Sequence, residues 1–176
     1  LASALASMVG NLTVGKKKYA DVEERMQAEL VELADTREHL LALIDEDARA
    51  FGPLAAAYGM PKGSDEERAA QSAALQAALV DACEVPLEIM ATSVQVIESC
   101  VFMARHGSVL ALSDAGAAAV LAKAALQAAS LNVVINIGSM DDAERAEGYR
   151  NQMEDLLAAG CAMADEVYAD VVKRLS

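Results

Sequence analysis

The sequence predicts an all-α fold, in which about five long helices form an up-and-down antiparallel bundle within a single domain, residues 1–176. Hydrophobic residues make up 55% of the chain, but Trp is absent and there are only two Phe. The small aliphatic side chains that predominate suit closely packed helices better than a pleated sheet. No stretch alternates apolar and polar residues as a strand does. The turn signals leave only short connections, which favour antiparallel neighbours.

The first helix is expected to begin at the start of the chain and to end near Thr13, because Gly15 follows. Asp21 is the predicted N-cap of the second helix, since two glutamates occupy the first turn after it. The second helix runs to about Tyr58, with a predicted kink at Pro53.

The third helix begins at a predicted capping box formed by Ser64 and Glu67. Pro86 is expected to kink this helix or to split it into two pieces. A histidine followed by a glycine, at His106, is a common helix end and predicts its C-terminus.

A fourth helix is predicted to be capped by Ser113 and Asp114 and to end near Ile137, and a fifth runs from about Asp142 to Leu175. The fourth helix has almost no polar face. It is therefore expected to be a central apolar helix that its neighbours cover on most sides. Such a helix in an acidic chain also favours a homodimer or a larger assembly.

The formal net charge is −13. Nucleic acids and anionic membranes both require a basic face, so neither is expected as a partner. The most apolar stretch, Ala115 to Ile137, contains Lys123 and three amide side chains. We therefore expect a buried core helix there rather than a membrane span.

The chain has three cysteines, which are Cys83, Cys100 and Cys161. Their number is odd, they are widely spaced, and each lies in an apolar helical stretch. Reduced core cysteines of a cytoplasmic protein have this pattern.

One carboxylate of the second helix falls among apolar residues. At about 100° per residue, one stripe of this helix comprises Val22, Met26, Leu33, Leu40, Ile44, Phe51, Leu54 and Tyr58. Asp47 lies within the stripe, and Glu29 maps to it as well. A carboxylate that loses water there needs a partner. Asp47 is either a catalytic or substrate-binding acid or one half of a buried ion pair, with Arg37 or with another helix, and the spacing leaves both interpretations open.

The fourth helix carries polar side chains along one face. This face comprises Asp114, Ala118, Leu121, Ala125, Ala128, Asn132 and Asn136. The alanines leave room, and the two amides can bind the edge of a heterocycle. Close helix packing with satisfied hydrogen bonds is the alternative, and Asp114 on its own is an ordinary cap.

The first helix has a line of small polar residues at Ser3, Ser7 and Asn11, which is either a packing seam or part of a binding site. The run from Lys16 to Lys18 is the one basic cluster of the chain. It can hold a carboxylate-rich ligand tail, although a charge run in a loop is usually solvated. No set of His and Cys has metal-ligand spacing, and no nucleophile elbow, phosphate loop or dinucleotide fingerprint occurs.

Several of these residues belong to motifs that occur in order along essentially the whole chain. They are Ser7–Gly10, Gly15–Tyr19, Asp45–Ala48 with Phe51, Pro61–Lys62, Val85–Leu87, Ser113–Asp114 and Asn132–Asn136. Together they resemble the cyclodeaminase domain of the formiminotransferase-cyclodeaminase family. Family members usually carry a glycine-rich segment before the first helix, which this sequence is expected to lack.

The resemblance implies a bundle that dimerises and binds folate in a cleft near the dimer interface. It implies one of two reactions: hydrolysis of 5,10-methenyltetrahydrofolate to 10-formyltetrahydrofolate, or cyclisation of 5-formiminotetrahydrofolate with release of ammonia. Both pass through a tetrahedral carbon between N5 and N10. Neither requires a metal or any cofactor beyond tetrahydrofolate as the carrier of the substrate. The length of a stand-alone domain favours the cyclohydrolase.

This chemistry assigns roles to the residues described above. Asp47 and Asp114 are the expected catalytic carboxylates, because a carboxylate can stabilise the cationic bridge and move a proton. The expected substrate-binding residues are Lys16, Lys18, Asn132, Asn136, Asn11 and Ser7. The asparagines would orient the pterin, and the lysines would meet the glutamate tail of a folate, including a polyglutamylated one.

Two other functions remain open. Glu29 and Glu32 have the spacing of an all-α nucleotide pyrophosphohydrolase that uses Mg²⁺, but the second acidic pair is missing, since Glu46 is followed by Arg49 at the same spacing. The other alternative is a non-catalytic helical scaffold, in which the polar residues of the stripes form only ion pairs.

Overall fold

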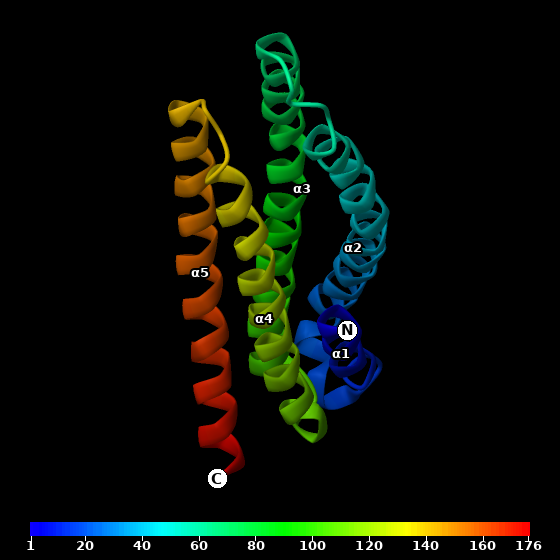
Figure 1. Ribbon diagram of the computed structural model, residues 1–176. Coiled ribbons are helices and arrows are strands. Elements are labelled where there is room, and N and C mark those ends of the chain that lie inside the picture. Colours follow the sequence, from blue (N-terminus) through cyan, green and yellow to red (C-terminus); the bar gives the residue numbers. More distant parts are fainter.

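The computed structural model describes residues 1–176 and confirms the all-α prediction (Figure 1). Its elements are α1 (Ala2–Asn11), η1 (Lys17–Val22), α2 (Glu23–Tyr58), α3 (Asp65–His106), η2 (Val109–Ala111), α4 (Leu112–Ile137) and α5 (Ala143–Leu175). The helices α2 to α5 are long, whereas α1 has only 10 residues. No strand is present. The bundle therefore has four long helices and one short helix.

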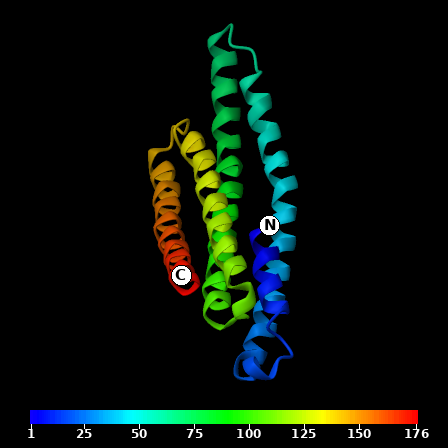
Figure 2. The same cartoon turned by 90° about the horizontal axis from the view of Figure 1, so that it is seen from below.

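The long helices run alternately up and down, as Figures 1 and 2 show. The helix α3 packs against α1, α2, α4 and α5, whereas α1 packs across the N-terminal part of α2. The hairpin of α2 and α3 reaches beyond the end of α4 and α5 in both views. The C-terminal half of α2 therefore has fewer neighbours than its N-terminal half.

Two predicted helix starts are confirmed. The Oγ atom of Ser64 accepts the N–H of Glu67 at 3.1 Å, and the Glu67 carboxylate accepts the N–H of Ser64 at 3.1 Å, which completes the capping box. Asp142 caps α5 because its carboxylate accepts the N–H of Arg145 at 3.0 Å. Each cap satisfies backbone donors that have no partner inside the helix.

Other predicted helix features are wrong. Asp21 lies within η1, and α2 begins after Val22 without a side-chain cap. Asp114 lies in the first turn of α4 rather than at its cap, because α4 already begins at Leu112. The helix α3 is continuous through Pro86, so of the two outcomes predicted there, a kink or a split, the split is wrong.

The main core cluster contains residues from all five helices. Two glycines allow close approach there. A Cβ atom at Gly160 of α5 would lie 2.5 Å from Leu126 Cδ2 of α4, and one at Gly116 of α4 would lie 3.0 Å from Val171 Cγ1 of α5. The surfaces of α4 and α5 therefore interdigitate at two separate levels.

The predicted apolar stripe of α2 is buried only in part. Met26 and Leu33 are buried, but Ile44, Phe51 and Tyr58 are 64%, 60% and 51% exposed. The C-terminal half of α2 instead contacts α3 through a small separate cluster, which comprises Leu54, Ala78, Leu79 and Ala82. The prediction that the whole stripe faces the core is therefore wrong for this half, because no second helix covers it.

The helix α4 is covered by α1, α3 and α5. A strip of apolar side chains on its remaining side is exposed, which comprises Val120, Leu121, Leu131, Val134 and Ile135.

Two helical spans, Asp65–His106 and Val109–Ile137, are long and apolar enough to cross a membrane by length and composition alone. Both spans pack inside the bundle, where 61% and 44% of their most apolar windows are buried. Lys123 within the second span binds the Asp165 carboxylate of α5 at 2.6 and 2.7 Å.

Candidate functional site

A groove of about 270 Å³ lies between α2 and α4, with Ala82 of α3 beside it. The helix α2 contributes Asp47, Ala50, Phe51, Leu54 and Tyr58, and α4 contributes Asn132, Ile135 and Asn136. The groove thus brings together three of the predicted site residues, Asp47, Asn132 and Asn136. They come from helices that are far apart in the sequence.

Asp47 is exposed and forms no ion pair, so the predicted burial and the alternative of an ion pair with Arg37 are both wrong. The reason is the position of Asp47 in the half of α2 that only α3 supports. An unpaired carboxylate at the edge of a groove is free to meet a cationic group of a ligand or to accept a proton.

The two asparagines differ in their freedom. Asn132 is exposed and makes no hydrogen bond to another side chain or to the backbone through its amide group. Asn136 is half-buried, and its Nδ2 donates to the carbonyl oxygen of Ala82 at 2.5 Å. This bond fixes the Asn136 amide plane and leaves its Oδ1 as an acceptor.

Phe51 and Tyr58 were expected in the core, but both line the groove and are more than half exposed. Planar side chains beside amides and a carboxylate suit a planar polar heterocycle. The seven-residue spacing between the aromatics, with Asp47 one turn before Phe51, is the sequence signal that could have identified them. Aromatic residues of a buried core stripe have the same spacing, and therefore spacing alone does not distinguish groove-lining aromatics from core aromatics.

The other predicted residues lie at the opposite end of the bundle. Ser7 donates from its Oγ to the carbonyl oxygen of Ser3 at 2.8 Å, so its hydroxyl is used within α1. Asn11, Lys16 and Lys18 are exposed.

The lysine loop lies beside the start of α4. The hydroxyl oxygen of Tyr19 accepts the N–H of Val109 at 3.3 Å, and this bond lowers the pKa of Tyr19 below its usual value. The Oγ1 atom of Thr13 accepts the N–H of Ser108 at 2.8 Å. These two hydrogen bonds connect the segment after α1 to the segment before α4. Asp114 lies in the first turn of α4, next to this connection. Neither Thr13 nor Tyr19 is among the predicted site residues.

One chain does not bring the two predicted catalytic carboxylates together. Asp114 and Asn132 are 18 residues apart on the same helix, which corresponds to about 27 Å along its axis. Asp47 shares a groove with Asn132, whereas Asp114 shares the opposite end with the lysines. The candidate residues therefore form two separate sets at opposite ends of the bundle. No group of three or more His, Cys, Asp or Glu side chains has the arrangement of a metal site.

Comparison with known proteins identifies the chain. Residues 1–155 match the family model described as formiminotransferase-cyclodeaminase. The chain belongs to this family. It is 39% identical, over its full length and 85% of the relative, to a methenyltetrahydrofolate cyclohydrolase from Methylorubrum extorquens. It is 34% identical to a rat formimidoyltransferase-cyclodeaminase over 89% of this chain, which spans 29% of that larger protein.

A solved structure shares the fold as well. The formiminotetrahydrofolate cyclodeaminase from Thermotoga maritima superimposes with a TM-score of 0.78 and 32% identity, covering 98% of this chain and 80% of that one. The resemblance inferred from the motifs is thus confirmed at the level of the family and of the fold.

Proposed function

We propose that this member of the formiminotransferase-cyclodeaminase family is a folate one-carbon enzyme, which hydrolyses 5,10-methenyltetrahydrofolate to 10-formyltetrahydrofolate. The convergence of Asp47, Asn132 and Asn136 on one groove is the observation that carries the proposal. The relative with cyclohydrolase activity in its name matches this chain over its full length.

The groove supplies what the reaction needs. The methenyl bridge is a cationic amidinium, so the Asp47 carboxylate stabilises it and accepts the proton of the attacking water. The attacked carbon becomes tetrahedral and carries a hydroxyl group. The bond from this carbon to N5 then breaks, N5 takes up a proton, and the hydroxyl loses its proton to leave the formyl carbonyl on N10. The free Oδ1 of Asn136 accepts an N–H of the pterin, and the exposed amide of Asn132 orients its edge. The rings of Phe51 and Tyr58 stack on the pterin plane.

Ammonia release from 5-formiminotetrahydrofolate is the second candidate reaction. The solved cyclodeaminase from Thermotoga maritima, at 32% identity over 98% of this chain, favours it. It passes through a similar tetrahedral carbon, so the same carboxylate and amides can serve both reactions.

The working unit is proposed to be a homodimer. The face of α4 that carries Asp114 at one end and Asn132 at the other is exposed at Ala125 and Ala128, whose small side chains allow a second helix to approach closely. Leu121 and Ile135 of α4, which lie on or next to this face, are exposed apolar side chains. A second copy packed antiparallel about a two-fold axis brings Asp114 of the partner to the groove that holds Asp47.

In this dimer, the end of the partner that carries the lysine loop lies near the glutamate tail of a folate bound in the groove. Lys16 and Lys18 are exposed in an otherwise acidic chain, so they are the proposed contacts of the glutamate tail, including a polyglutamylated one. Asn11 and Ser7 lie on the adjoining α1 and complete the proposed binding set.

Neither a metal nor a further cofactor enters the proposed reaction. A cytoplasmic location is also proposed, because the three cysteines are free thiols, two of them buried. Tetrahydrofolate derivatives are the proposed small-molecule partners.

The test is an assay with 5,10-methenyltetrahydrofolate in the presence of EDTA, which follows loss of the methenyl chromophore. Rapid loss above the uncatalysed rate is expected, and 5-formiminotetrahydrofolate is then tested as a second substrate. Turnover of the formimino compound alone assigns the cyclodeaminase. If the folded full-length protein turns over neither compound, the proposal is rejected and the non-catalytic helical scaffold is the remaining interpretation.

Subunit mixing tests the two-chain site. Asp47→Asn and Asp114→Asn homodimers are both expected to be inactive, but mixed dimers contain one site with neither change. Random mixing should therefore restore about one quarter of the wild-type activity. No recovery, despite exchange of subunits, means that each site is built from one chain.

A further inference from the structure

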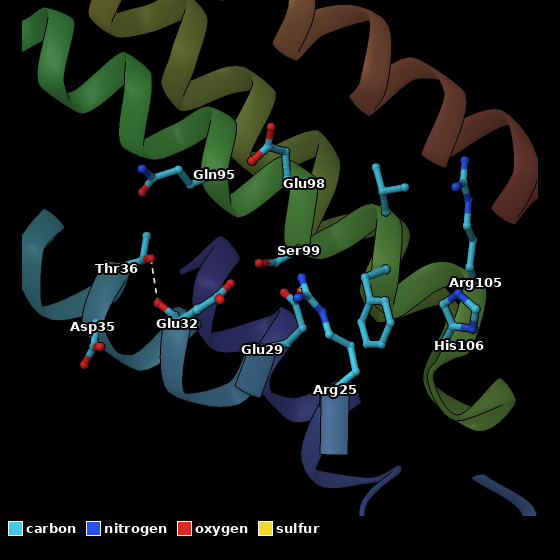
Figure 3. A pocket seen from close by; sticks show the side chains of 12 residues that line it. Arg25, Glu29, Glu32, Asp35, Thr36, Gln95, Glu98, Ser99, Arg105 and His106 are labelled. Atoms are coloured by element: carbon cyan, nitrogen blue, oxygen red, sulfur yellow. Dashed lines mark hydrogen bonds and ion pairs between the residues drawn. The ribbon is translucent and has the colours of Figure 1, made fainter. Parts of the chain in front are cut away.

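The three lysines before α2 have no acidic partner within the chain. Neither Lys16 nor Lys17 nor Lys18 forms an ion pair, although the chain has 27 acidic residues. The largest cavity differs in this respect. It measures about 520 Å³ and lies between α2 and α3 (Figure 3), where Arg25 binds the Glu29 carboxylate and the lining carboxylates outnumber the arginines. A ligand rich in carboxylates therefore meets free cations at the lysine loop and not in that cavity.

Tyr19 connects the lysine loop to the start of α4. Its hydroxyl oxygen accepts the N–H of Val109 at 3.3 Å, and Val109 begins the short helix η2 that leads directly into α4. Ser108, one residue earlier, is only 2% exposed, and its N–H donates to Thr13 Oγ1 at 2.8 Å. A buried hydrogen bond thus holds the segment to which the Tyr19 hydroxyl is attached.

The backbone of the lysine loop is held at both ends. Gly15 has a φ of +75°, a left-handed conformation that glycine adopts without steric cost. Its N–H donates to the Glu23 carboxylate of α2 at 2.9 Å. The N–H of Tyr19 donates to the carbonyl oxygen of Lys16 at 2.9 Å. These bonds restrict the loop backbone, so most of the remaining freedom lies in the lysine side chains.

One of the three lysine side chains lies against an aromatic ring. The Nζ atom of Lys18 is 5.2 Å from the centroid of the Tyr19 ring, a distance typical of a cation–π contact. The hydrogen bond from Val109 lowers the pKa of Tyr19, and Lys18 acts in the same direction. Lys16 and Lys17 have no such contact. Tyr19 therefore restricts one lysine to a position that is defined relative to α4.

We propose that Tyr19 is a positioning residue for recognition of the folate glutamate tail, because its ring holds Lys18 and its hydroxyl fixes the ring to the start of α4. This inference rests on the proposed function, which supplies the folate. Asp114 lies in the first turn of α4, so Tyr19 sets the position of the tail contact relative to that carboxylate. A lysine that is held in advance loses less conformational entropy on binding. Lys18 is therefore the main tail contact, and Lys17 adds only general positive charge.

Calorimetric titration of the full chain with p-aminobenzoyl-triglutamate, the tail half of a polyglutamylated folate, tests this inference without turnover. Saturable binding is expected. Lys18→Gln should weaken it about fivefold, because an exposed charge pair is lost. Lys17→Gln is the matched control, since it makes the same change of charge one residue away. It should weaken binding less than about twofold. Equal losses at the two positions, or no binding by the wild type, would overturn the proposal.

Tyr19→Phe removes the hydroxyl and keeps the ring. It should weaken binding of the tail fragment about twofold to fivefold, because the ring and Lys18 are no longer fixed to α4. Its Tm should stay close to that of the wild type, since the lost hydrogen bond is exposed. Tyr168→Phe is the matched control, because Tyr168 of α5 is 54% exposed and its hydroxyl is far from either residue set. Unchanged affinity in folded Tyr19→Phe contradicts the proposal.

The double variant Lys18→Gln/Tyr19→Phe distinguishes positioning from an independent contact. If Tyr19 acts through Lys18, the double variant binds the tail fragment no more weakly than Lys18→Gln alone. Additive losses would mean that Tyr19 acts without Lys18, and they would overturn the proposal.

Steady-state kinetics separates this role from the proposed reaction. With the triglutamate form of 5,10-methenyltetrahydrofolate, Tyr19→Phe should raise KM about twofold to fivefold and affect kcat less. A loss of kcat at constant KM contradicts a role in tail positioning. Wild-type protein that binds the tail fragment but turns over no folate would reject the proposed reaction and leave the role of Tyr19 intact. Turnover without binding of the fragment would reject the role of Tyr19 alone.

Discussion

The two halves of α2 have different surroundings. In the N-terminal half, Met26 and Leu33 are buried and even the carboxylate of Glu29 is enclosed. In the C-terminal half, Asp47 and Phe51 of the same apolar stripe are exposed. The short helix α1 packs against α2, α3 and α4 and closes only the first half. One pattern of apolar spacing thus supports a core in one half and an open binding surface in the other, and the neighbouring helix decides which.

Replacing Asp47, in the exposed half of α2, should give the largest effect, and this effect should be on activity and not on stability. Asp47→Asn is expected to lower kcat for 5,10-methenyltetrahydrofolate by about 10²- to 10⁴-fold, because it removes the proton acceptor. Its Tm should not change, since the side chain is exposed and unpaired. Glu46→Gln, one residue earlier and outside the groove, is the control for steady-state kinetics. Full turnover by a folded Asp47→Asn protein would remove the groove from the mechanism.

Shortening one stripe side chain in each half of α2 should show that only the N-terminal half contributes to the core. Leu33→Ala is expected to lower the free energy of unfolding by about 2–5 kcal/mol, because Leu33 is 1% exposed. Ile44→Ala should cost about 0.5 kcal/mol or less in dilute protein, since Ile44 is 64% exposed. Urea unfolding measures both. Similar losses at the two positions would contradict the contrast between the halves.

Phe51 tests whether the exposed half binds a planar ligand. Phe51→Ala is expected to raise KM for the folate substrate about tenfold through loss of stacking, with little change in Tm. Phe51→Tyr, which keeps the aromatic ring, should retain most of the affinity. A change in Tm without a change in KM would assign Phe51 to structure instead.

Helix order, the capping box at Ser64 and the C-terminal end of α3 followed from the sequence, because these features depend on residues close together in the chain. The pairing of Asp47 with Asn132 and Asn136 in one groove also agrees with the predicted residue set. The sequence did not predict which carboxylate of the α2 stripe is buried. Asp47 and Glu29 occupy equivalent stripe positions, and only the placement of α1 and α3 determines which one is enclosed.

The buried half also predicts a smaller effect, one of pH on stability. Burial raises the pKa of Cys100 to about 12, from a reference value of 9.0. Well below pH 9 the thiol is protonated in both states and its contribution to stability is complete. As the pH rises further, only the unfolded chain ionises, so stability falls. Between pH 8 and pH 10 this loss is about 1.4 kcal/mol.

Comparing urea unfolding of wild type and Cys100→Ala at pH 8 and pH 10 isolates this contribution. The variant should lose about 1.4 kcal/mol less than the wild type over this interval. Cys161→Ala is the control, because Cys161 is only half-buried. Identical pH dependence in Cys100→Ala and wild type would show that the thiol is not enclosed in solution.

The close contact at Gly160 has a consequence for motion. Sliding α5 along α4 by one helical turn, about 5.4 Å, would place Leu156 or Ala164 where Gly160 now receives Leu126. Neither position has room for the leucine side chain, and Val171 meets the same obstacle at Gly116. The two close contacts, at Gly160 and at Gly116, therefore hold α4 and α5 in a single register.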